Sequence, residues 1–247
     1  MFLKEYVTTP NFYKFVAMKS KSDINKLTLA KSAILKFISG LLAMATLLFI
    51  PAGSISYVGG WTLMALLFIP MLLLGVVMLC CSPELLQQRL NAKEKREQQK
   101  WVTALSSLIF ILGFIVAGLD YRFSLTEIPN WLRVASSVLF IISYVLYAEV
   151  VRENQWLSRT IKVSENQQVV SRGLYGVVRH PMYTSTITLF ISMPIVLGSW
   201  WSLLIFLFYI PIIVVRIIDE EKLLLQELKG YDQYCKNVRW RLFPYLW

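Results

Sequence analysis

The hydrophobic positions of this chain fall into long runs rather than into the short alternating patterns of a soluble core. A helix needs about 20 apolar residues to cross the hydrocarbon layer of a membrane. Runs of or near this length predict membrane-spanning helices over residues 33–51, 57–81, 101–119, 131–151, 182–198 and 200–218. The sequence therefore predicts an all-α fold, a polytopic integral membrane protein with six transmembrane helices.

Composition excludes several other classes of protein. Of the 247 residues, 56% are hydrophobic and only 16% are charged, whereas an ordinary globular chain carries about 25% charged residues. The same figures exclude a disordered chain, a coiled coil and a collagen-like fibre. The three cysteines are Cys80, Cys81 and Cys235. They lack the spacing of metal ligands, so we expect no metal site.

The positive charge is distributed unevenly about the predicted helices. Of the 25 Lys and Arg residues, all but Arg122 and Arg133 lie in the segments that would share one side of the membrane. Because cytoplasmic segments carry the excess of Lys and Arg, we expect both termini and the active site on the cytosolic side. The net charge of +10 then reflects membrane topology, and no nucleic-acid partner is expected.

Three regions follow from these patterns. Residues 1–30 form a polar cytosolic segment, residues 31–151 a four-helix transmembrane region, and residues 152–247 the region that carries the chemistry. The first four predicted spans hold almost no ionisable residue, and no inverted repeat is visible, which weighs against a transporter. A non-catalytic transporter or scaffold stays open as an alternative.

The last two predicted helices form a hairpin. They are joined by a three-residue turn, and each is about 24 Å long, measured from residue 182 up to 198 and from 200 back to 216. The hairpin therefore returns Arg216 to the membrane level of His180, the only histidine of the chain. We expect one cytosolic mouth to gather aromatic, basic and acidic side chains: Tyr175, His180, Tyr183, Arg216, Asp219, Glu220 and Glu221.

Motifs in this region resemble a known family. The chain reads GLYGVVRHPMY over 173–183, RIIDEE over 216–221 and YDQYCKNV over 231–238. This combination resembles the isoprenylcysteine carboxyl methyltransferase family and its relatives, the phospholipid N-methyltransferases, over about residues 150–247. The segment SPELLQQRLNAKEKREQQKW also resembles bacterial members. The resemblance implies an integral membrane enzyme that uses S-adenosyl-L-methionine as its cofactor.

The resemblance also implies roles for individual positions. Arg216 matches the family's substrate-binding arginine, and with Glu221 it is the candidate catalytic pair. Two positions depart from the family pattern, because Ser185 and Tyr245 stand where glycines are usual. The implied cofactor-binding residues are Gln167, Gln168, Val169, Val170, Tyr175, His180, Pro181, Met182, Tyr183 and Glu220.

The residue types suit methyl transfer. A helix N-terminus beside His180 suits the carboxylate of the cofactor, and tyrosine faces suit a sulfonium. A carboxylate acceptor is already ionised at neutral pH and would be held by Arg216 without a general base. An amine acceptor would need a base, for which Glu221 or His180 is the candidate. The expected partners are a lipophilic or lipidated substrate and membrane lipid; prenylated protein ends, lipid acids, amino phospholipids and thiols all stay open.

A second enzyme class shares part of the motif. Membrane reductases of the steroid-reductase type use a nicotinamide cofactor and carry a similar Arg-His-Pro, usually followed by Asn-Tyr-x-Gly-Glu. Here Met-Tyr-Thr-Ser-Thr follows over 182–186, which favours the methyltransferase. In the tail, Tyr231 and Tyr234 either close over the cofactor or pack against the end of the last helix, and we expect packing.

Overall fold

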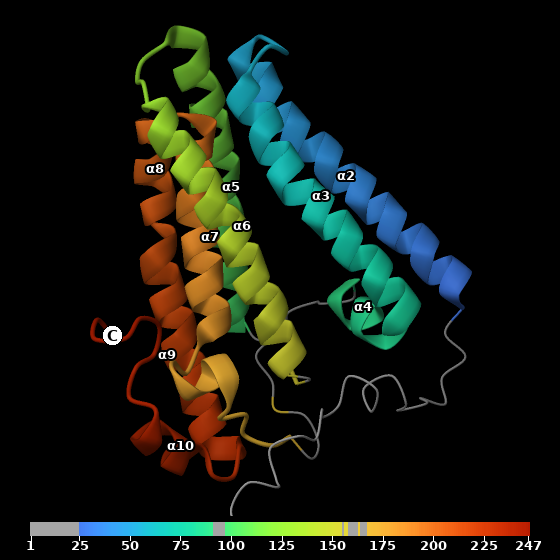
Figure 1. Cartoon of the computed structure of the whole chain (residues 1–247), viewed down its shortest axis with the longest axis vertical. Helices are drawn as coiled ribbons and strands as arrows, with labels where there is room; N and C mark the ends of the chain where they lie inside the picture. Colours follow the sequence, from blue (N-terminus) through green and yellow to red (C-terminus); the bar gives the residue numbers. More distant parts are fainter. Residues whose placement is uncertain (1–24, 91–96, 155, 158–162, 164–166) are drawn as a thin grey trace, which may run out of the picture.

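The structure is a computed structural model that describes residues 25–90, 97–154, 156–157, 163 and 167–247. Most of the predicted segment 1–30 lies outside these ranges. The described residues form helices connected by turns and loops (Figure 1). The helices are α2 (Lys26–Ala52), α3 (Val58–Cys81), α4 (Pro83–Leu90), α5 (Glu97–Phe123), α6 (Asn130–Glu153), η1 (Gly173–Gly176), α7 (Pro181–Leu197), α8 (Trp200–Leu207), α9 (Tyr209–Glu227) and α10 (Tyr231–Asn237).

The prediction of an all-α membrane protein is confirmed. Within the described ranges, five helical stretches are long and apolar enough to cross a membrane, with α8 and α9 together forming one of them; α7 is a shorter apolar helix of 17 residues. The first helix begins at Lys26 rather than at residue 33, because the Asn25 side chain accepts hydrogen bonds from the amides of Leu27 and Thr28. The last continues to Glu227 as a polar helix beyond the apolar run.

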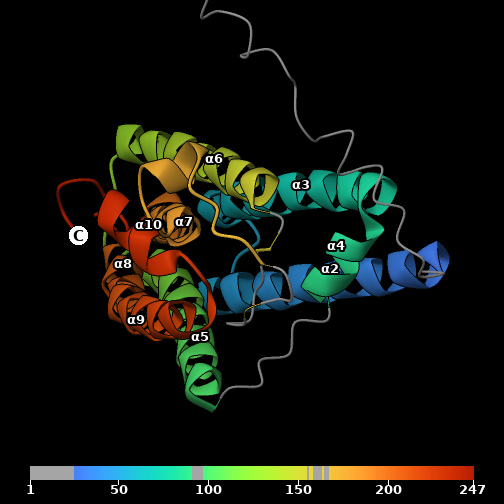
Figure 2. The ribbon, with the colours of Figure 1, turned by 90° about the horizontal axis from the view of Figure 1, so that it is seen from below.

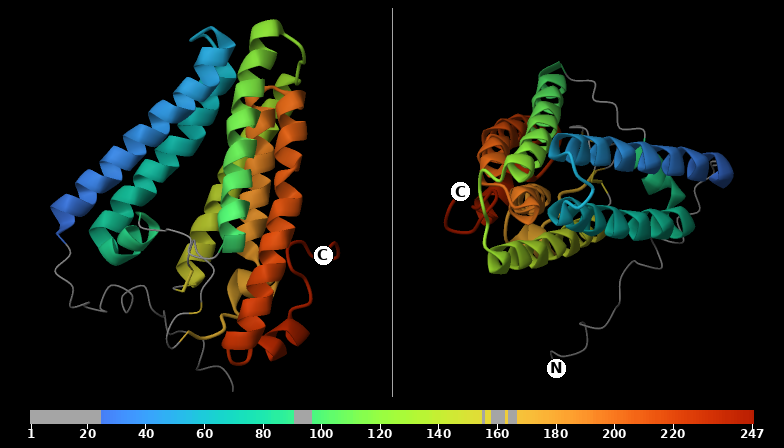
Figure 3. Two further views of the ribbon diagram at one scale, coloured as in Figure 1. Left: turned by 180° about the vertical axis from the view of Figure 1, so that it is seen from behind. Right: turned by 90° about the horizontal axis from the view of Figure 1, so that it is seen from above.

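Helix α7 lies at the centre of the bundle that it forms with α5, α6, α8 and α9. It contacts α3, α5, α6, α8 and α9, and the views along the helix axes show it enclosed by these elements (Figures 2 and 3). Ten of its residues are buried, including the polar Ser185 and Ser192. Helices α2 and α3 lean away from this bundle toward α4 (Figure 1). The N-terminus of α7 is thus placed by several helices at once.

The turn between α7 and α8 is held by a buried carboxylate. Gly198 has a φ of 87°, which glycine adopts without strain. The next residue, Ser199, donates its hydroxyl to Asp120, which is only 1% exposed. Asp120 also accepts the backbone N–H of Thr126 at 2.8 Å, and Tyr57 donates to the Leu197 carbonyl at 2.7 Å. These bonds fix the hairpin at the end of the bundle opposite α10.

Substitution of Asp120 tests whether its hydrogen bonds stabilise the turn between α7 and α8. In Asp120→Ala the donors on Thr126 and Ser199 lose their acceptor inside the protein, so we expect the melting temperature in detergent to fall by about 6 °C. Glu127→Ala is the matched control, because Glu127 is exposed in the same loop. An equal melting temperature for the two variants would contradict a stabilising role of Asp120 in this turn.

Candidate functional site

Glu221 on α9 is a buried carboxylate surrounded by nitrogen donors. Its Oε1 lies 3.1 Å from Nε2 of His180 and 3.3 Å from Nε of Arg179, and its Oε2 accepts from Nε of Arg241 at 2.8 Å. Because a carboxylate only accepts hydrogen bonds, Nε2 of His180 carries its proton. Burial of a charge is costly unless it is paired, and here the pairing joins α9, the start of α7 and the C-terminal tail.

Backbone hydrogen bonds attach the same tail to the start of α7. The amide of Arg179 donates to the Trp240 carbonyl at 2.8 Å, and the amide of His180 donates to the Arg241 carbonyl at 2.9 Å. One turn into α7, the hydroxyl of Thr184 donates to the Leu242 carbonyl at 2.7 Å. The tail therefore determines where the His180 ring and the first turn of α7 lie.

The turn η1 carries Tyr175 and depends on a glycine. Gly173 has a φ of 58°, and a Cβ at this position would lie 1.5 Å from the carboxylate of Glu153. That carboxylate accepts the backbone N–H of Leu174 at 3.0 Å. The approach of η1 to the end of α6 thus requires a residue without a side chain.

Tyr175 is held from both sides. Its hydroxyl accepts from Nδ2 of Asn154 at 2.9 Å, and its carbonyl accepts the hydroxyl of Tyr234 at 2.7 Å. Burial raises the pKa of Tyr175 well above that of an ordinary tyrosine, so its phenol stays neutral. The ring is thereby presented as a fixed aromatic face.

Tyr183 links two residues proposed from the sequence, Arg216 and Glu220. Its hydroxyl donates to Oε2 of Glu220 at 2.6 Å and accepts from Nε of Arg216 at 2.9 Å. The start of α7 and the end of the apolar part of α9 therefore lie side by side, as expected, and Tyr183 lies between the two charged groups. Tyr183 itself is buried, so the position of all three side chains is closely defined.

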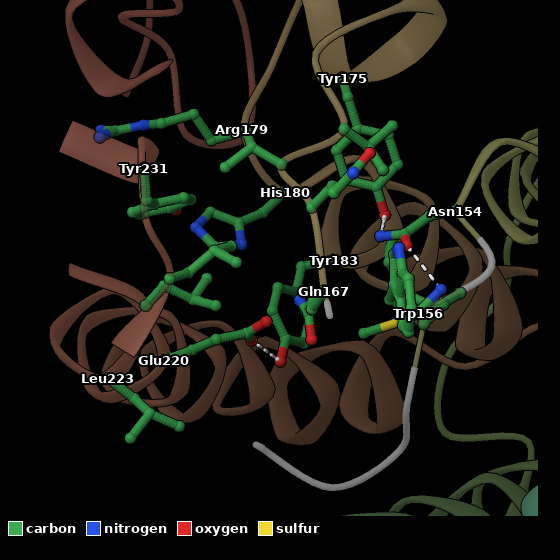
Figure 4. Close-up of a pocket in the computed structure, with 17 residues that line it drawn as sticks. Asn154, Trp156, Gln167, Tyr175, Arg179, His180, Tyr183, Glu220, Leu223 and Tyr231 are labelled. Carbon is green, nitrogen blue, oxygen red and sulfur yellow. Dashed lines mark hydrogen bonds between the residues drawn. The ribbon is translucent and has the colours of Figure 1, made fainter. Parts of the chain in front are cut away.

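A polar cavity lies where these elements meet, at the α10 end of the bundle (Figure 4). It encloses about 90 Å³ within a hollow of about 780 Å³ that opens to solvent. Its lining residues come from the end of α6, the segment before η1, the start of α7, the end of α9 and α10: Asn154, Trp156, Leu157, Gln167, Gln168, Val169, Val170, Tyr175, Arg179, His180, Met182, Tyr183, Glu220, Leu223, Leu224, Leu228 and Tyr231.

Most residues proposed from the sequence line this cavity, and four do not. Pro181 is the first residue of α7, and Arg216 lies behind Tyr183. Asp219 is buried outside the lining, and Glu221 is enclosed by its partners. The cavity also contains residues that no motif marked, among them Asn154 and Trp156. The sequence offers one indication of them, because they lie in the polar stretch directly after the predicted membrane helix 131–151.

The two positions that depart from the family's glycines lie outside the cavity. Ser185 is buried and donates its hydroxyl to the Met182 carbonyl in its own helix. Tyr245 has a φ of 66° and is 88% exposed. Its backbone therefore adopts the left-handed conformation that glycine favours, although the residue carries a side chain.

The two tyrosines of the tail differ in their surroundings. Tyr234 packs as expected and donates to the Tyr175 carbonyl. Tyr231 also packs against the end of α9, in the cluster with Leu228 and Val238, but it lines the cavity as well. The sequence gives no signal for this difference, because both tyrosines belong to one short helix.

A second cavity of about 410 Å³ shares no lining residue with the polar one. It lies along the middle of α7, against α9, one residue of α6 and the tail. Its lining is apolar apart from Thr188: Leu139, Ile187, Ile191, Ile210, Val214, Leu242, Phe243, Leu246 and Trp247.

Comparison with known proteins agrees with the motif resemblance. Residues 131–231, which include α6, α7, α8 and α9, match the model of the family described as PEMT, phospholipid methyltransferase. The resemblance to membrane methyltransferases is thus confirmed for this part of the chain. The chain is also 29% identical over 91 residues to Delta(14)-sterol reductase TM7SF2 of Mus musculus, a match that covers 36% of this chain and 22% of that protein.

Substitutions in η1 test the close approach to α6. In Gly173→Ala the new Cβ displaces the Glu153 carboxylate, and the residue is strained at positive φ. We expect the melting temperature to fall by about 5 °C or more. Gly176→Ala is the control, since its Cβ would lie 3.3 Å from the nearest atom, the Ser171 carbonyl oxygen. Equal melting temperatures in a thermal-shift assay would refute the proposed constraint.

Proposed function

Since residues 131–231 match the phospholipid methyltransferase family, we propose that this protein transfers a methyl group from S-adenosylmethionine to a lipophilic acceptor in the membrane. The observation that carries the proposal is the polar cavity, whose lining includes nine of the ten residues that the family resemblance marks for the cofactor. The excess of Lys and Arg in the segments on one side supports a cytosolic position for this cavity and for both termini.

The cavity residues fit this cofactor chemically. The cavity is lined by the rings of Tyr175 and Tyr183, which suit a cation, and by the carboxylate of Glu220, which suits an ammonium or a ribose hydroxyl. The hydroxyl of Tyr231 is buried in the wall with no hydrogen-bond partner in the described structure, as expected of a group that binds a ligand. When bound, the cofactor supplies an electrophilic methyl group.

A carboxylate is the acceptor that the surrounding residues favour. Both oxygens of Glu221 are engaged by His180, Arg179 and Arg241, so Glu221 is poorly placed to take a proton. An acceptor that is already ionised needs no base. Arg216 would hold it, and Tyr183 and Glu220 would orient that guanidinium. The apolar cavity along α7 supports an acceptor with a long aliphatic part.

A reductase is the second candidate. The similarity to a sterol reductase favours it, and a nicotinamide cofactor would then occupy the polar cavity. Both enzyme classes carry an Arg-His-Pro motif like Arg179-His180-Pro181, but the residues that follow it here differ from the reductase pattern. The choice between the two enzymes therefore rests on which cofactor binds.

Calorimetry on detergent-purified protein separates the candidates. We expect S-adenosylmethionine to bind and NADPH to give no heat of binding. Glu220→Gln should weaken S-adenosylmethionine binding about tenfold, because it removes a charge that faces the cavity. Glu227→Gln, at the far end of the same helix and outside the cavity, is the control. Binding of NADPH alone would favour the reductase, and binding of neither would favour a transporter or scaffold.

Substitution of Arg216 tests its role toward the acceptor. Because Arg216 lies outside the cavity, Arg216→Ala should change cofactor affinity less than about threefold. Methyl transfer should fall about a hundredfold, since a charged partner of the acceptor is lost. The readout is radiolabelled methyl incorporated into a lipid extract. Arg216→Lys retains the charge without the bidentate geometry and should be intermediate. Unchanged transfer in Arg216→Ala would rule out the proposed role.

A further inference from the structure

Tyr231 carries a buried hydroxyl that has no hydrogen-bond partner among the residues that the structure describes. The residue is 4% exposed, and its hydroxyl makes no hydrogen bond within the described ranges. Burial raises the pKa of this phenol, and the charges of Glu221 and Glu220 raise it further. The hydroxyl therefore keeps its proton and can donate. Native proteins leave few buried polar groups unpaired, and such groups call for an explanation.

Tyr234 provides an internal comparison. It lies one turn further along α10, its ring centroid is 5.6 Å from that of Tyr231, and it is 5% exposed. Its hydroxyl, however, donates to the Tyr175 carbonyl at 2.7 Å. Helix, burial and residue type are thus shared, and the missing partner distinguishes Tyr231. Since Tyr231 also lines the cavity, a ligand is the available acceptor.

The cavity has two chemically different ends. Figure 4 shows Asn154 and Trp156 at one end, Gln167 beside Tyr183 near the middle, and Arg179, Glu220 and Tyr231 toward the other end. An indole face with amide groups suits a nucleobase, which stacks and forms neutral hydrogen bonds. Side chains of both charge signs suit a zwitterion such as an amino acid.

Basic side chains lie close to the Tyr231 side of the cavity. The single negative charge of Glu221 is contacted by two guanidinium groups, those of Arg179 and Arg241. Glu220 is connected to a third guanidinium, that of Arg216, through Tyr183. Of these guanidinium groups, that of Arg179 belongs to the lining of the cavity, at the wall where the Tyr231 donor also lies.

We propose that the Tyr231 hydroxyl donates a hydrogen bond to the carboxylate of the amino-acid part of the cofactor, with Arg179 supplying positive charge beside it. Glu220 is then placed for the ammonium, and the end with Trp156 receives the nucleobase. This inference rests on the proposed methyltransferase function. It assigns a ligand-binding role to the first tyrosine of the tail motif, a position to which the family resemblance gives no role, and fixes the direction in which the cofactor lies.

The test compares two ligands that differ at one end. S-adenosylhomocysteine contains the amino-acid part, and 5′-deoxy-5′-methylthioadenosine lacks it. By calorimetry, Tyr231→Phe should weaken binding of S-adenosylhomocysteine about tenfold and leave binding of methylthioadenosine unchanged. The melting temperature of ligand-free Tyr231→Phe should not fall, because the lost hydroxyl makes no hydrogen bond to the described part of the chain. Tyr234→Phe, the matched control, should lower the melting temperature, since it removes an internal hydrogen bond.

Three outcomes would overturn the proposal. Unchanged binding of S-adenosylhomocysteine by Tyr231→Phe would exclude contact with the hydroxyl. An equal loss for both ligands would place the hydroxyl at the nucleoside instead. If the unaltered protein binds neither ligand, the methyltransferase function itself fails, which is a different result from a failure of the variant alone.

Discussion

The site depends on the neutralisation of one buried carboxylate. Glu221 is buried, and an unpaired charge at a buried position would be strongly destabilising. Its partners come from two other segments, Arg179 and His180 before α7 and Arg241 in the tail. Because all three must converge to satisfy the charge, this contact brings together parts of the chain that are distant in sequence. The cavity forms around that junction.

The hairpin could be derived from the sequence because its geometry follows from helix rise alone. Equal lengths on either side of a short turn return Arg216 to the level of Tyr183, and the hydrogen bond between them agrees with this. The roles of single residues within the cluster did not follow in the same way. The motif makes Glu221 a candidate base, whereas its contacts with His180, Arg179 and Arg241 lead us to propose a structural role for it.

The contribution of the tail was not predictable from residue types. The tail binds the start of α7 through the carbonyls of Trp240, Arg241 and Leu242, and backbone groups are the same whatever side chain is attached. The contrast between Tyr231 and Tyr234 is equally hidden in the sequence. Both fit a short amphipathic helix, and their difference depends on Tyr175, which lies more than fifty residues earlier.

The burial of α7 has a consequence for biogenesis. With 17 residues the helix rises about 26 Å, less than the roughly 30 Å hydrocarbon thickness of a bilayer. Its hydroxyl side chains face protein, and its far end is fastened to Asp120 through Ser199. Such a segment partitions weakly into lipid by itself. It is therefore expected to insert late, together with α8 and α9, against helices that the translocation machinery has already released.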